Sequence, residues 1–102
     1  MGVSRTDLFD IEQNELAQLG RIFSHPARIA ILQFMAESGT CTNGDLVMHL
    51  GLAQPTVSQH LRELKMGGLI KGSIEGNTVA YCIDSKQWKD SKKMFIELFD
   101  SI

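Results

Sequence analysis

The middle of the chain predicts two helices joined by a turn of only three residues. The first helix is short, over about residues 43–50, and its apolar residues recur at helical spacing. Gly51 allows a tight turn, and a longer helix then opens at Gln54 or Pro55 and ends at Gly67-Gly68. A short helix, a glycine-containing turn and a longer helix form the helix-turn-helix pattern.

The longer helix combines one apolar stripe with a polar outer face that carries little charge. At about 100° per residue, Val57, Leu61 and Leu64 fall on the stripe that faces the core. Amide and hydroxyl side chains and arginine are the groups that read base edges in the major groove. We therefore expect the helix to bind DNA, and the alternative is a face that contacts only water. The expected residues are Gln54, Pro55, Thr56, Ser58, Gln59, His60, Arg62 and Lys65.

The residues after Gly68 predict a β-hairpin followed by a last helix. Two apolar, β-branched runs at 69–74 and 78–83 flank Glu75-Gly76-Asn77, a three-residue connection with glycine. Such a hairpin would form a wing beside the helix-turn-helix, and we expect Asn77 near its tip to contact DNA. The last helix begins near residue 84 or 85 and runs to the end of the chain.

Two further helices are expected before the helix-turn-helix, over about residues 12–23 and 26–38. Pro26 fits the first turn of the second of them, with Ser24 or His25 as its cap. Residues 1–11 are expected to be a flexible or partly ordered arm. The 102 residues therefore predict a single domain, mainly α with a small β-hairpin (α+β).

Charge and hydropathy restrict the function classes. A net charge of −2 weighs against a nonspecific nucleic-acid coat, which would be strongly basic, but not against a sequence reader. No apolar run approaches the roughly 18–20 residues that span a bilayer, and the first residues lack a secretory apolar region. We expect a cytoplasmic protein. It is not expected to be an enzyme, because no nucleophile–base pair or glycine-rich phosphate loop is present.

Several stretches resemble the ArsR/SmtB-type transcriptional regulators. They are Ser24-His25-Pro26-Ala27-Arg28-Ile29-Ala30-Ile31-Leu32, Leu52 to Leu61, and Gly67-Gly68-Leu69-Ile70 with Gly76-Asn77 and Tyr81. The resemblance implies a homodimeric winged helix-turn-helix repressor that binds an inverted-repeat operator in double-stranded DNA and is released by an unidentified signal. It also implies that the first and last helices form the dimer interface. The residues expected there are Leu16, Leu19, Phe23, Trp88, Phe95, Leu98 and Phe99.

The resemblance leaves the signal open. Many relatives sense a metal through Cys-x-Cys on the third helix, but the corresponding stretch here holds Cys41 alone, and the last helix has no histidine. We therefore expect no metal and no cofactor. Cys41 and Cys82 are expected to be structural thiols, and the alternative is a redox-active pair. The competing function is a winged-helix protein-interaction module without DNA binding, which should expose apolar anchors on the outer face of the longer helix.

Overall fold

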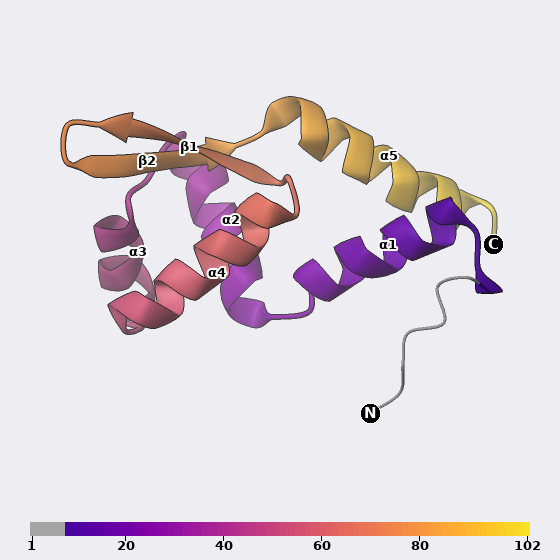
Figure 1. The fold of residues 1–102 in the computed structure, drawn as a ribbon, viewed down its shortest axis with the longest axis horizontal. Coiled ribbons are helices and arrows are strands. Elements are labelled where there is room, and N and C mark those ends of the chain that lie inside the picture. Colours follow the sequence, from indigo (N-terminus) through magenta and orange to yellow (C-terminus); the bar gives the residue numbers. More distant parts are fainter. Residues whose placement is uncertain (1–7) are drawn as a thin grey trace.

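The computed structural model describes residues 8–102 as five α-helices and one antiparallel β-hairpin (Figure 1). The elements are α1 (Ile11–Ile22), α2 (Pro26–Ser38), α3 (Asn43–Leu50), α4 (Gln54–Met66), β1 (Ile70–Glu75), β2 (Thr78–Ile83) and α5 (Ser85–Asp100). Helices α1 and α5 lie side by side at one end, and α3 and the hairpin lie at the other (Figure 1). This arrangement confirms the expected α+β winged helix-turn-helix.

Capping side chains fix where α1, α3 and α5 begin, and at α5 the Asp84 carboxylate accepts from the backbone N–H of Gln87. The Asp10 carboxylate accepts from the backbone N–H of Gln13, whose side chain accepts from the N–H of Asp10. Thr42 and Asp45 make the same reciprocal pair at the start of α3. Because Asp10 caps it, α1 begins slightly earlier than expected, so the end of the predicted arm is helical. Residues 1–7 of that arm lie outside the described residues.

The turn between α3 and α4 depends on Gly51. Its φ of 71° lies in the left-handed region that glycine adopts without steric cost. The helix α4 then begins without a side-chain cap, since Ala53 has no hydrogen-bonding group, and Pro55 occupies its first turn. The short turn therefore allows α4 to pack against α3.

The core forms where α2, α3 and α4 meet. Ile31 and Met35 from α2 and Leu46 from α3 have no exposed surface. The predicted stripe of α4 completes this core: Val57, Leu61 and Leu64 are at most 2% exposed. Burial of one stripe fixes the rotation of α4 and leaves its polar residues outside.

The hairpin connection is shorter than expected. Glu75 pairs with Thr78 in the strand register, so only Gly76 and Asn77 join the strands, and the predicted three-residue connection is wrong. Gly76 has a φ of 65° and Asn77 a negative φ, as in a type II′ turn with glycine first. An isolated bridge between Cys41 and Tyr81 ties the hairpin to the segment before α3. No helix within residues 8–102 is long and apolar enough to cross a membrane.

Candidate DNA-binding surface

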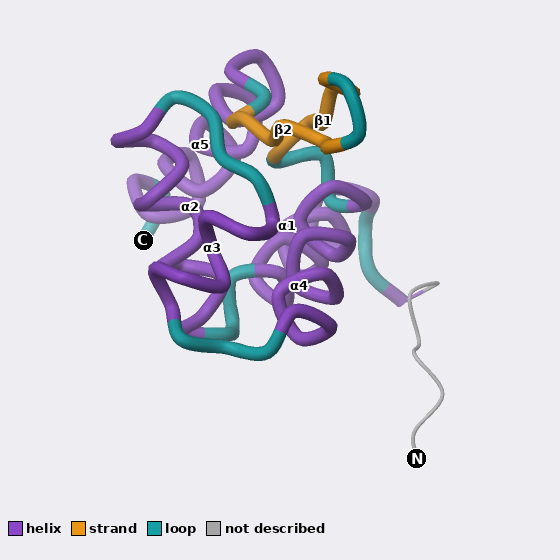
Figure 2. Tube along the Cα trace, turned by 90° about the vertical axis from the view of Figure 1, so that its left-hand side faces the viewer, coloured by secondary structure: helices purple, strands orange, loops and turns teal. Residues whose placement is uncertain are grey.

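The outer face of α4 is defined here by the exposed side chains of Gln54, Thr56, Ser58, Gln59, Arg62 and Lys65. It lies opposite the buried stripe, and Pro55 is exposed at its start. Figure 2 shows α3 and α4 next to each other, with the hairpin on the same side of the molecule. The first turn of α4 holds no acidic residue, whereas Lys65 lies in its last turn. The face therefore offers hydrogen-bonding groups and positive charge together.

A polar cavity of about 430 Å³ joins the outer face of α4 to the hairpin. Gln54 and Ser58 border it from α4, and Asn77 borders it from the hairpin turn. The structure thus brings together three residues that the sequence predicts for DNA binding. The rest of the wall comes from residues that the sequence did not single out for binding at this site: Thr42, Asn43 and Gly44 at the start of α3, and Thr78, Val79 and Tyr81 from β2.

Asn43 contacts the outer face directly. Its side-chain Nδ2 donates to Ser58 Oγ at 2.8 Å. The sequence carries no signal for this contact, because the two residues lie fifteen positions apart and on different helices. Only the packing of α3 against α4 reveals it.

His60 lies on the flank of α4 that faces α2. The buried Arg28 donates from Nε to His60 Nδ1 at 3.1 Å and from Nη1 to the Ile22 carbonyl oxygen at 3.4 Å. Burial, and after it the charges of Arg28 and His25, lower the pKa of His60. Its ring is half-buried and its Nδ1 accepts from Arg28, so this contact helps to hold α4 against α2. DNA contact by His60 stays a prediction.

Three other members of the outer face, Gln59, Arg62 and Lys65, are also exposed. Gln59 Nε2 donates to Glu63 Oε2 at 3.3 Å, one helical turn further along α4. This bond is exposed and can exchange for a contact with a ligand. Arg62 and Lys65 are exposed, and their long side chains can reach a phosphate beside the helix.

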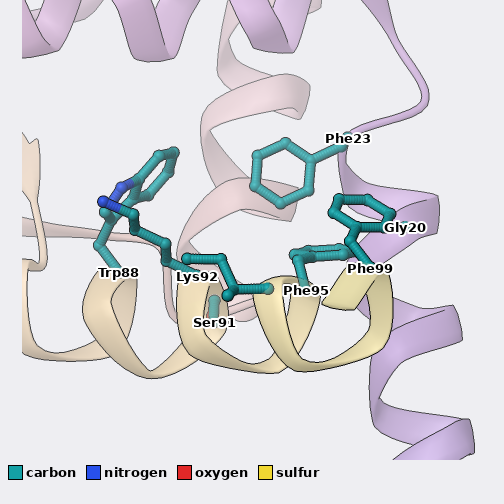
Figure 3. A pocket seen from close by; sticks show the side chains of 8 residues that line it. Gly20, Phe23, Trp88, Ser91, Lys92, Phe95 and Phe99 are labelled. Carbon is teal, nitrogen blue, oxygen red and sulfur yellow. The ribbon is translucent and has the colours of Figure 1, made fainter. Parts of the chain in front are cut away.

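A second surface, which is apolar, lies at the other end of the molecule, between α1 and α5. Phe23 packs edge-on against Trp88 and Phe95, each with ring centroids 5.9 Å apart, and Phe95 stacks on Phe99 at 6.2 Å. These rings border a groove of about 590 Å³ (Figure 3). We call this groove the α1/α5 face. It is lined by Gly20, Phe23, Trp88, Ser91, Lys92, Phe95, Ile96 and Phe99.

The residues that the sequence predicts for a dimer interface are distributed over two grooves. Phe99, on the α1/α5 face, is 68% exposed, and α5 contains no buried residue. Leu98, which is 38% exposed, and the half-buried Leu16 border a separate groove between α1 and α5. Leu19 is only 9% exposed within a single chain and packs in the intramolecular core, and its place in a dimer interface stays a prediction. It has little surface left for a second subunit.

Both cysteines are free thiols. Cys41 exchanges backbone hydrogen bonds with Tyr81 at 3.0 and 2.8 Å, so these two residues lie directly opposite each other. Successive strand side chains point to opposite sides, and Cys82 therefore faces away from Cys41. A disulfide would require the backbone to move. Burial, and after it the Asp45 charge, raises the pKa of the Cys41 thiol to about 11, which keeps it protonated.

Residues 8–102 contain no group of three or more His, Cys, Asp or Glu side chains placed to hold a metal ion. The charged residues of α5 are mostly lysines. Lys86 pairs with Asp90 at 3.5 Å on the exposed side of the helix, and further lysines follow at positions 89, 92 and 93. Positive charge of this density does not attract a cation.

Comparison with known proteins identifies the family. The profile of bacterial regulatory proteins of the arsR family matches residues 25–71, which include α2, α3 and α4. An uncharacterised HTH-type transcriptional regulator of Methanocaldococcus jannaschii is 34% identical over 82 residues, covering 80% of this chain and 92% of that protein. The HTH-type transcriptional regulator CmtR of Mycobacterium tuberculosis is 38% identical over 74 residues, covering 72% of this chain but only 62% of CmtR.

The fold has relatives of known structure. HlyU from Vibrio cholerae superimposes with a TM-score of 0.71 at 25% identity, over 89% of this chain and 98% of HlyU. The match therefore includes the helices at both ends as well as the helix-turn-helix. On the sequence and structural evidence together, the chain belongs to the arsR family of bacterial regulatory proteins.

Proposed function

We propose that this chain is a sequence-specific, DNA-binding transcriptional repressor that acts as a homodimer. The observation that carries the proposal is the outer face of α4, which is polar, exposed and continuous with the hairpin turn through one polar cavity. Membership of a family of regulatory proteins supports the same function. The competing interaction module would need apolar anchors on this face, and its members are all polar or charged.

In the proposed complex the first half of α4 enters the major groove. Gln54 can pair with the N6 and N7 atoms of adenine, and the hydroxyls of Thr56 and Ser58 can reach base edges. Arg62 lies two turns from the start of α4, where the helix leaves the groove, and it would hold a phosphate. Asn77 on the hairpin turn would touch the DNA backbone beside the groove.

The dimer is proposed from the α1/α5 face. Aromatic residues that stay exposed in one chain become buried when the same face of a second chain covers them. Phe99 at 68% exposure is the clearest of these. A twofold axis would place two copies of α4 roughly 34–36 Å apart, one helical turn of DNA. The expected operator is therefore an inverted repeat in double-stranded DNA.

Selection of bound fragments from a random duplex library tests the proposal. We expect the chain to enrich one palindromic motif. Replacing Gln54 or Ser58 with alanine should weaken operator binding by about 1–3 kcal/mol and relax the base preference. Replacing Arg62 should instead weaken binding to all sequences and reduce its dependence on salt. Lys86→Ala, on the exposed side of α5, is a control for loss of charge.

Two results would count against the assignment of α4 to the groove. One is equal operator binding by the natural chain and the Gln54→Ala/Ser58→Ala double variant. The other is failure of the natural chain to enrich any motif.

Separate addition of Zn²⁺, Cd²⁺, an oxidant and polysulfide to the operator complex then tests the releasing signal. Release by either metal would overturn the expectation that this chain senses none.

A further inference from the structure

We propose that Asn43 sets the hydrogen-bond direction of Ser58, so that Ser58 presents its hydroxyl proton to DNA and selects an acceptor atom on a base. The inference rests on the proposed function and concerns how the outer face of α4 chooses its sequence. Asn43 acts as a positioning residue, since it contacts Ser58 and not the base.

The contact joins two elements at the edge of the polar cavity. Asn43 is the first residue of α3, directly after the Thr42 cap, and this position fixes its backbone. Its side chain is half-buried and reaches across to Ser58 Oγ at 2.8 Å, a short distance for a nitrogen donor. Ser58 itself is exposed on α4. The protein therefore holds one side of the hydroxyl and leaves the other side open.

The direction of the bond follows from the other end of the amide. Asn43 Oδ1 is buried and has no partner among the described residues. With the amide reversed, an NH₂ group carrying two donors would occupy this unpartnered site. Buried N–H groups without partners are rarer in proteins than carbonyl oxygens that lack one. Nδ2 therefore faces Ser58, and Ser58 accepts.

A serine hydroxyl has one proton to donate and two lone pairs that accept. Asn43 occupies a lone pair, and within residues 8–102 Ser58 donates its proton to no protein acceptor. The proton is therefore available on the exposed side. In the major groove it would find guanine O6 and N7, adenine N7 or thymine O4 as acceptors, whereas the amino groups of adenine and cytosine could use only the one remaining lone pair of Ser58.

The variant Asn43→Asp reverses this direction. An ionised carboxylate can only accept, so the Ser58 proton turns toward the new carboxylate and the lone pairs turn toward DNA. At the position that Ser58 contacts, the preference should move toward the amino groups of adenine or cytosine, by about 5-fold or more. An aspartate is favourable in the first turn of a helix, so α3 should still form. Asn43→Ala should relax the preference without reversing it.

The matched control is Met48→Asp. It introduces the same charge on α3, at a side chain that is 87% exposed and does not border the cavity. Both aspartate variants should bind all DNA more weakly, because they add charge that repels phosphate. The readout is therefore the relative base preference at each position and not the total affinity. Thermal unfolding of each variant verifies the fold.

The experiment compares motifs selected from a random duplex library by the natural chain, Asn43→Asp, Asn43→Ala, Ser58→Ala and Met48→Asp. Support requires that Ser58→Ala and both Asn43 variants alter the same position of each half-site, while Met48→Asp alters none. An unchanged motif with both Asn43 variants would overturn the inference and leave the proposed function standing. An unchanged motif with Ser58→Ala would also overturn the inference, together with the base contact proposed for Ser58. If the natural chain selects no motif, the proposed function fails, and this inference fails with it.

Discussion

Replacing Phe99 with alanine should weaken the proposed dimer by roughly 100- to 1000-fold. Phe99 is 68% exposed in one chain, at the open end of the α1/α5 face. Full burial of a phenylalanine side chain contributes about 2–3 kcal/mol, so burial of the exposed part contributes about 1.5–2 kcal/mol per copy. A twofold interface counts each residue twice, which gives about 3–4 kcal/mol per dimer. At about 1.4 kcal/mol per tenfold, this corresponds to the stated range.

Sedimentation of the natural chain and of Phe99→Ala over a wide concentration range measures the dissociation constant of the dimer. Ile74→Ala is the matched control, because Ile74 is 82% exposed but lies on β1, away from α5. It should leave the dissociation constant unchanged. Equal constants for Phe99→Ala and the natural chain, or a monomeric natural chain at every concentration, would refute the reasoning. The operator affinity of Phe99→Ala should fall together with its dimerisation.

Three further predictions concern stability and chemistry. The folded-state pKa of His60 lies below its ordinary value of 6.5, so the unfolded chain binds the proton more readily than the folded chain. The free energy of unfolding should therefore fall as pH drops below 6.5. In His60→Asn, the melting temperature should depend less on pH over the same range. Thiol titration should modify Cys82 first and Cys41 only on unfolding, since the Cys41 pKa is about 11; equal rates would contradict its burial. Leu64→Ala should lower the free energy of unfolding by about 2–5 kcal/mol in denaturant titrations, because Leu64 has no exposed surface.

Elements with local causes were predictable from the sequence. The capping pair of Thr42 and Asp45 and the end of α2 at Gly39 depend on residues within one turn of each other, so such features follow from the local sequence. The apolar stripe of α4 was predictable for the same reason, because helical periodicity decides which side chains share a face. The hairpin itself was predicted correctly, but the length of its connection was not. The pairing of Glu75 with Thr78 depends on strand register, and this pairing shortens the connection.

Contacts between distant residues were not predictable. Leu19 and Phe99 are both apolar and both fit a dimer stripe, but only the crossing of α1 over the core shows that Leu19 is already buried. His60 belongs to a polar helix, and only the packing of α2 against α4 shows that Arg28 engages it. Periodicity gives the face of a helix but not the neighbour that covers its flank.

The sequence by itself determines the helices, their caps and the polar side of α4, because hydrogen bonds within one turn and periodic apolar spacing act over a few residues. The tertiary structure decides which of those polar groups are free. It places His60 within hydrogen-bond distance of Arg28, 32 residues away in the sequence, and Ser58 within hydrogen-bond distance of Asn43, 15 residues away. Such pairings depend on the angles at which helices pack, and those angles follow from the fit of whole side-chain surfaces.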